Sequence, residues 1–186
     1  MPLLLMTRRW LLLFVAAFAL FHCLGCKADR RRLSAKERAE FAPISKGINH
    51  ASSLTLYEGL PHQTWEPEVL AKELATKKTI VRHEFPFYER PLPVAAGDVE
   101  ALRRLSAAGE SFAPYLGPKN CGGYHPDYCL AWKDAETTYE LLICFGCHEM
   151  KLYGPKQEML VDIKKEPFTQ FEKTLQKYQA QRPKRE

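Results

Sequence analysis

Residues 127–163 read DYCLAWKDAETTYELLICFGCHEMKLYGPKQEMLVDI, and this stretch contains the strongest β-strand signals in the chain. Its aromatic, β-branched and aliphatic runs are typical of strands, and the polar or Gly-Pro segments between them are typical of turns. The pattern predicts strands over residues 127–132, 137–145, 150–153 and 159–163. Strands that follow one another with short turns favour an antiparallel meander.

Apolar residues with helical spacing lie on both sides of this stretch. They predict helices over 66–77 and 98–107, and a third helix that begins near Pro167. The apolar stripe of the third helix is Phe168, Phe171, Leu175 and Tyr178. The expected fold class is therefore α+β, with a small antiparallel sheet, strongest at 127–163, flanked by about three helices.

The order of these signals predicts one folded domain over residues 53–179. Before it, residues 26–52 are charged and then small and polar, which predicts a basic linker with at most one weak helical turn. After it, residues 180–186 predict a basic tail.

The N-terminus has the organisation of an export signal. Arg8 and Arg9 precede an unbroken apolar run of twelve residues, 10–21 (WLLLFVAAFALF). A helix that spans a bilayer needs about 20 such residues, whereas the apolar region of a signal peptide has the length seen here. Residues 1–25 are therefore expected to be a signal peptide.

The segment that follows, Cys23-Leu24-Gly25-Cys26, resembles a bacterial lipobox. The resemblance covers the export signal alone, and it implies cleavage before Cys26 and attachment of lipid, with acyl chains such as palmitate, to the Cys26 sulfur. The chain departs from that family at Cys23, where the family usually has Leu. Lys27 in place of Asp implies sorting to the outer membrane in a Gram-negative cell. The alternative is an ordinary secretory signal or an uncleaved anchor.

Charge is distributed unevenly along the chain, whose formal net charge is +5. Residues 27–38 contain six basic and two acidic residues, and residues 173–186 contain five basic and one acidic, so the body between them is acidic. Basic residues beside a lipid anchor gain about 1 kcal/mol each near anionic headgroups. The pattern favours membrane lipid as a partner of Cys26 and residues 27–38, and an exported acidic body excludes nucleic acid.

Four cysteines remain in the expected folded body: Cys121, Cys129, Cys144 and Cys147. An even number of cysteines in an exported domain favours disulfides, and all three pairings stay open. Cys129 and Cys144 lie in two strands that are predicted to pair, where residues that face each other can come within reach of a disulfide.

Residues 144–148 read CFGCH and fit three other kinds of site. The C-x-x-C-H spacing is that of haem attachment in cytochromes c, with Cys144, Cys147 and His148 as the candidate residues. As C-x-x-C it fits a redox dithiol. With Cys121 and Cys129, the same two cysteines fit a four-thiolate zinc site. The β-run that leads into the motif and the short chain after it favour disulfides over haem and over a dithiol.

The partners of Cys144 and Cys147 depend on the backbone at Gly146. In a flat strand, residues three apart point to opposite faces. The two cysteines can therefore converge on one partner only if the chain bends at Gly146.

Nucleophilic catalysis would need a cysteine beside a base and an orienting acid. His125 and Asp127 are two residues apart and could serve with a cysteine. The segment Tyr124-His125-Pro126-Asp127 is equally typical of a turn. No catalytic residue and no cofactor is therefore expected.

The segments CGGYHPDYCLAW (121–132) and LLICFGC (141–147) together resemble a bacterial family of no assigned activity. Its pattern is a cysteine loop, a strand and then Ile-Cys-Phe-x-Cys. The resemblance implies a shared structural role for Cys121, Cys144 and Cys147.

These patterns together predict an exported, membrane-anchored lipoprotein with a structural or binding role in the cell envelope and without enzymatic activity. The alternative is an extracytoplasmic redox, haem or metal-binding module that uses residues 144–148. No particular protein partner follows from the sequence.

Overall fold

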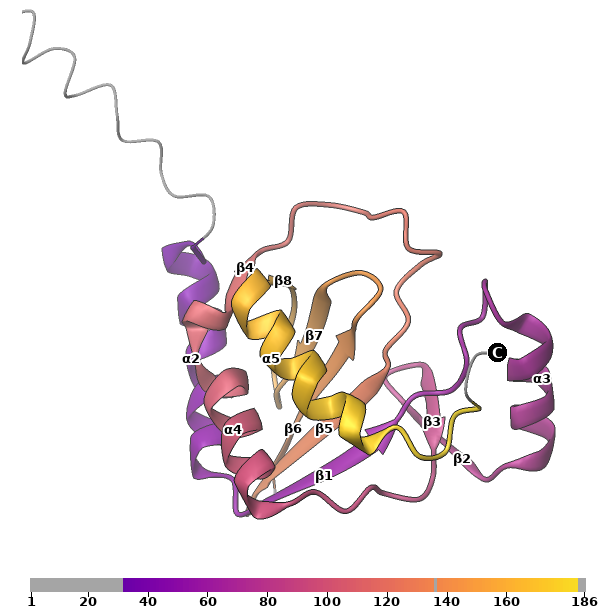
Figure 1. The fold of residues 1–186 in the computed structure, drawn as a ribbon. Coiled ribbons are helices and arrows are strands. Elements are labelled where there is room, and N and C mark those ends of the chain that lie inside the picture. Colours follow the sequence, from indigo (N-terminus) through magenta and orange to yellow (C-terminus); the bar gives the residue numbers. More distant parts are fainter. Residues whose placement is uncertain (1–31, 136, 184–186) are drawn as a thin grey trace, which may run out of the picture. The chain divides into compact units, whose positions relative to one another are not determined.

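A six-stranded antiparallel sheet forms the centre of the fold (Figure 1). The structure is a computed structural model that describes residues 32–135 and 137–183, all within one unit of the chain. The strand order is β1 (Ser53–Glu58), β5 (Tyr128–Asp134), β6 (Thr137–Cys144), β7 (Glu149–Tyr153), β8 (Glu158–Ile163) and β4 (Phe112–Pro114). Strands β5 to β8 form the meander, and β1 and β4 pair with its two edges.

Three of the helices cover one face of this sheet, and a smaller unit lies beside β1 (Figure 1). The helices are α2 (Ala35–His50), α3 (Pro67–Thr76), α4 (Ala96–Ala107) and α5 (Lys165–Leu175), with 3₁₀ turns at Gly109–Ser111 and Gln176–Tyr178. The smaller unit consists of α3 and the two-stranded sheet of β2 (Thr79–Arg82) and β3 (Phe85–Tyr88).

Side chains of the sheet alternate between two apolar cores, as the period of two in a strand requires. Leu130 and Trp132 of β5 and Leu141 and Ile143 of β6 point into the main core under α2, α4 and α5. On the opposite face, Cys129 and Leu142 pack with Phe87 of β3 in a smaller core. The sheet is therefore buried on both faces near the β5–β6 pair.

The α+β class is confirmed, but the sheet and the helices are more extensive than expected. The sheet has six strands, and the described residues contain four α-helices instead of about three. Strands β1 and β4 were missed as members of this sheet because they pair with partners far away in the sequence. Helices α3, α4 and α5 and the four meander strands lie where the sequence predicts them.

The expected linker over residues 26–52 is wrong from Leu33 onward. A 16-residue helix, α2, fills most of it, and its N-terminus is closed by a capping box between Ser34 and Glu37. Its buried residues Phe41, Ile44 and Ile48 lie in the main core. The helix was missed because Pro43 and Gly47 weaken its local signal. A Cβ on Gly47 would lie 2.0 Å from Cζ of Tyr139, so glycine allows α2 to approach β6 closely.

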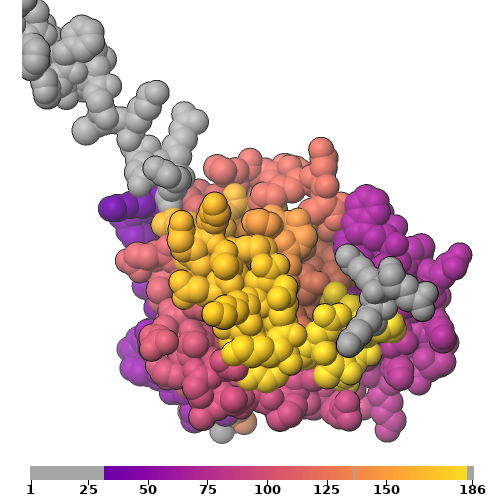
Figure 2. Space-filling view, viewed as in Figure 1, coloured from indigo at the N-terminus to yellow at the C-terminus, as the bar shows by residue number. Residues whose placement is uncertain are grey.

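The first residues of the expected basic tail also pack on the domain. After α5 the chain runs across the surface toward α3, as the yellow segment in Figure 2 shows. The backbone N–H groups of Ala180, Gln181 and Arg182 donate to the carboxylate of Glu58. The sequence could not reveal this because the partner lies in β1.

No helix among residues 32–135 and 137–183 is long and apolar enough to cross a membrane. The expected signal peptide, the lipid-attachment residue Cys26 and residues 27–31 of the basic segment lie outside the described residues.

Candidate functional site

The loop between β4 and β5 is joined to the sheet by a disulfide. This irregular segment, residues 115–127, passes over one end of the sheet (Figure 1). Cys121 of the loop is bonded to Cys147 in the β6–β7 turn, with a Cα–Cα distance of 5.5 Å. The sequence left open three ways to pair all four cysteines. The structure contains one of the possible bonds, Cys121–Cys147, and leaves Cys129 and Cys144 as free thiols, so none of the three complete pairings is formed.

The CFGCH stretch consists of Cys144, the last residue of β6, and the tight turn that leads into β7. The N–H of His148 donates to the carbonyl of Phe145, and His148 has a positive φ of 57°. The chain therefore does bend here, but His148 and not Gly146 adopts the left-handed conformation. The backbone N–H of Cys147 donates to Sγ of Cys144 at 3.2 Å, while Sγ of Cys147 is bonded to Cys121. The two cysteines have different partners.

Cys129 and Cys144 do not face each other across the β5–β6 pair. The register places Leu142 opposite Cys129 and Glu149 opposite Cys144. Both thiols are buried, and burial raises the pKa of Cys144 to about 11 and that of Cys129 further. Both therefore stay protonated near neutral pH and are poor nucleophiles.

The haem and zinc alternatives would both use the thiol of Cys147, which the disulfide consumes. A zinc site would also need Cys121, the other half of that bond. Within the described part of the chain no group of three or more His, Cys, Asp or Glu side chains is placed to hold a metal ion.

His125 and Asp127 lie close together but do not form a catalytic arrangement with a cysteine. Nδ1 of His125 is 3.9 Å from Oδ1 of Asp127, whereas its Nε2 is 2.7 Å from the carbonyl oxygen of Leu60. Because a carbonyl oxygen only accepts hydrogen bonds, Nε2 is the protonated nitrogen, and it donates its hydrogen to the carbonyl of Leu60. Burial lowers the pKa of His125 to about 4. The imidazole therefore supports the backbone at Leu60.

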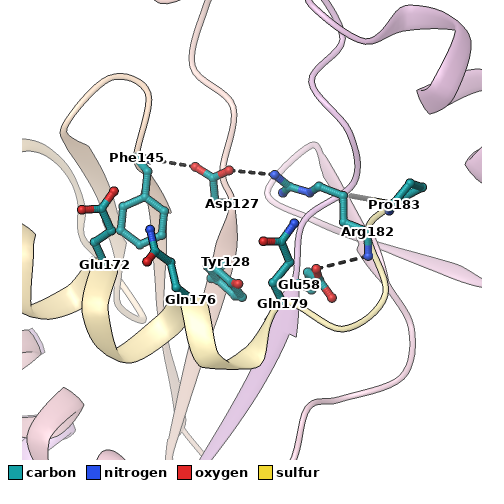
Figure 3. A pocket seen from close by; sticks show the side chains of 9 residues that line it. All are labelled: Glu58, Asp127, Tyr128, Phe145, Glu172, Gln176, Gln179, Arg182 and Pro183. Atoms are coloured by element: carbon teal, nitrogen blue, oxygen red, sulfur yellow. Dashed lines mark hydrogen bonds and ion pairs between the residues drawn. The ribbon is translucent and has the colours of Figure 1, made fainter. Parts of the chain in front are cut away.

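A half-open cavity of about 470 Å³ adjoins Asp127 (Figure 3). Its walls come from the ends of β1 and β5, the β6–β7 turn, helix α5 and the segment after it. The lining residues are Glu58, Asp127, Tyr128, Phe145, Glu172, Gln176, Gln179, Arg182 and Pro183.

The charged groups Glu58, Asp127 and Arg182 of the cavity lining are paired. Arg182 and Asp127 form an ion pair at 2.9 Å, and the other Asp127 oxygen accepts from the backbone N–H of Phe145 at 2.7 Å. Glu58 is 1% exposed and accepts three backbone N–H bonds from residues 180–182. These contacts fix the C-terminal segment as one wall.

The other polar groups of the lining have no such partners. Among the described residues, no hydrogen bond or ion pair joins the side chains of Glu172, Gln176 or Gln179, or the hydroxyl of Tyr128, to another group. Tyr128 is 5% exposed, and burial raises the pKa of its hydroxyl. The cavity therefore presents unused donors and acceptors beside the aromatic rings of Tyr128 and Phe145.

The chain matches no family model, no curated protein and no solved structure. Of the lining residues, sequence reasoning singled out Asp127 alone, as a candidate orienting acid. Glu58, Glu172 and Arg182 were not singled out, because nothing in the local pattern reveals that they meet in space.

Proposed function

We propose that the protein is an exported lipoprotein, anchored through lipid on Cys26, whose folded domain has a binding or structural role in the cell envelope. The observation that carries the proposal is the Cys121–Cys147 disulfide in a chain that begins with an export-type apolar run and a lipobox-like segment. Disulfides persist in exported proteins and are rare in the reducing cytosol. The disulfide and the N-terminal pattern thus support the same compartment independently.

The anchor would hold the folded domain close to the lipid. Leu33 is the first buried residue of the domain, seven positions after Cys26. A fully extended chain spans at most about 3.6 Å per residue, so this tether reaches about 25 Å. It includes Lys27 and the basic run Arg30–Arg32, which are attracted to anionic headgroups. Lys27 supports outer-membrane sorting in a Gram-negative cell.

Binding is favoured over catalysis by the chemistry of the candidate residues. The free thiols of Cys129 and Cys144 are buried and protonated, and Nε2 of His125 is occupied by a backbone carbonyl. The redox, haem or metal module stays a prediction, and it would require the Cys121–Cys147 bond to open first.

The anchor is tested by labelling the full-length chain with radioactive palmitate in a bacterial host. We expect label on the wild-type protein and its loss in Cys26→Ala, because the acyl chains are carried by that cysteine. The control is Cys23→Leu, which introduces the residue usual in lipoboxes and should keep the label. Equal labelling of wild type and Cys26→Ala contradicts the proposed anchor.

A thiol count on the denatured, unreduced protein gives a second test. After cleavage before Cys26 and modification of its sulfur, Cys129 and Cys144 are the remaining free thiols, so two are expected per chain. Four free thiols would mean either that Cys23 and Cys26 are both retained unmodified or that the Cys121–Cys147 bond is absent. Peptide mapping of the alkylated cysteines distinguishes the two, and alkylated Cys26 would contradict lipidation.

A further inference from the structure

We propose that the cavity beside Asp127 binds a small organic cation that carries a primary amine or a guanidinium group. The inference deepens the binding role proposed above and rests on it. It does not depend on lipidation of Cys26.

The charge balance of the cavity favours a cation. Its lining contains three carboxylates, Glu58, Asp127 and Glu172, against one guanidinium, Arg182. Arg182 neutralises Asp127, and backbone N–H groups satisfy the oxygens of Glu58. The carboxylate of Glu172 has no partner among the described residues. An ammonium or guanidinium group can therefore form a charge-assisted hydrogen bond there, and an anion is repelled.

The side chain of Tyr128 supplies a second, independent indication of a ligand. Tyr128 is 5% exposed and lines the cavity, and its hydroxyl has no hydrogen-bond partner among the described residues. The hydroxyl is not one of the fully buried unpaired atoms, so it is open to the cavity, where a ligand can reach it. A phenol oxygen accepts from an N–H donor while its own hydrogen can point to an acceptor on the ligand.

The remaining lining groups suit the body of such a ligand. The rings of Tyr128 and Phe145 meet edge to face with centroids 6.1 Å apart, and aromatic rings attract organic cations. Figure 3 places Glu172 beside the Phe145 ring at one end, with Arg182 and Glu58 at the other. The side-chain amides of Gln176 and Gln179 offer additional donors and acceptors. The volume of about 470 Å³ lies in the range of small-molecule sites.

Putrescine (butane-1,4-diamine) is a suitable probe because it carries two primary amines and no other functional group. We would titrate it into the ¹⁵N-labelled full chain in detergent micelles and follow the side-chain amide signals of Gln176 and Gln179. We expect saturable shifts of these two signals and not of Gln63 or Gln157, which lie outside the cavity.

Matched variants connect the shifts to the cavity. Glu172→Gln removes the unpaired carboxylate and should weaken binding about tenfold. Glu166→Gln makes the same change in the same helix, outside the lining, and should bind as the wild type does. Tyr128→Phe keeps the ring but removes the hydroxyl and should weaken binding about fivefold.

Three outcomes would overturn the inference. These are no shift of Gln176 and Gln179 at saturating putrescine, equal affinity in Glu172→Gln and Glu166→Gln, or the same shifts with calcium chloride at matched ionic strength. The last would mean general ionic attraction instead of a site for an organic cation. The palmitate-labelling result is independent of this titration, so failure of the anchor and failure of the ligand site are separable.

Discussion

Gly59 lies where three parts of the chain approach one another closely. A Cβ at this position would be 2.0 Å from the carbonyl oxygen of Pro126. The N–H of Gly59 donates to the carbonyl of Asp127 at 2.8 Å, and its own carbonyl accepts from Nη2 of Arg182 at 2.9 Å. This one residue without a side chain therefore allows the end of β1, the start of β5 and the C-terminal segment to meet beside the cavity.

We predict that Gly59→Ala lowers the free energy of unfolding by about 2 kcal/mol or more, because the backbone at Pro126 must move to admit the methyl group. The control is Gly97→Ala in α4, where a Cβ meets nothing within 4 Å. That change should raise stability by up to about 1 kcal/mol, since alanine loses less entropy in a helix. Urea unfolding followed by circular dichroism measures both, and equal effects would contradict the close approach.

His125 makes folding depend on pH. It is 7% exposed, and burial lowers its pKa from 6.5 to about 4. The unfolded chain therefore takes up this proton at a higher pH than the folded one. The neutral imidazole of His125 therefore contributes fully to the free energy of unfolding above about pH 6.5, and this contribution is lost as the pH falls through 4. The pKa shift corresponds to about 3 kcal/mol of unfolding free energy.

Unfolding midpoints between pH 4 and pH 7 test this assignment. In His125→Gln, the amide can still donate to the carbonyl of Leu60 but does not titrate. We predict a shallower loss of stability on acidification than in the wild type. An identical pH dependence in the two proteins would mean that His125 does not carry the effect.

At the scale of elements, helix α2 shows that a helix can form where the local pattern of apolar residues does not predict one. Its buried residues Phe41, Ile44 and Ile48 have helical spacing, but proline, glycine and charges interrupt the stripe. Strands β5 to β8 and helices α3 to α5 were predicted because their patterns are denser. Helix α2 is stabilised by burial against β5 and β6, which a local pattern cannot reveal.

We predict that Ile48→Ala lowers stability by about 2 to 4 kcal/mol, because it leaves a cavity in the main core. Lys46→Ala in the same helix removes an exposed side chain and should change stability by less than about 0.5 kcal/mol. Chemical denaturation of the two variants gives the comparison. If Ile48→Ala were as harmless as Lys46→Ala, residues 35–50 would be the linker that the sequence suggested.

At the scale of the whole molecule, two long-range connections close the domain around the cavity. The disulfide joins the β4–β5 loop to the β6–β7 turn across a sequence separation of 26 residues. Glu58 joins the C-terminal segment to β1 across a separation of up to 124 residues. Both connections restrict segments that lack regular secondary structure.

We predict that the double variant Cys121→Ala/Cys147→Ala is less stable than the wild type by about 3 kcal/mol. Without the bond the unfolded chain gains the conformational entropy that a closed loop of this length denies it. Adding dithiothreitol to the wild type should reproduce most of that loss. The same reductant should leave the double variant unchanged. A wild type that is insensitive to reduction would show that the loop is held by its other contacts.

The sequence by itself determined the features that depend on neighbours along the chain. These are the meander over residues 127–163, helices α3 to α5, and therefore the α+β class. Side-chain periodicity carries this information because each strand or helix exposes one pattern to solvent and another to the core.

Only the tertiary structure decided which distant groups meet. It paired Cys121 with Cys147, put β1 and β4 on the edges of the sheet, docked α2 on the main core, and brought Glu58, Asp127, Glu172 and Arg182 to one cavity. The physical reason is that each of these contacts depends on strand register and on packing between segments far apart in sequence, and a local pattern contains neither.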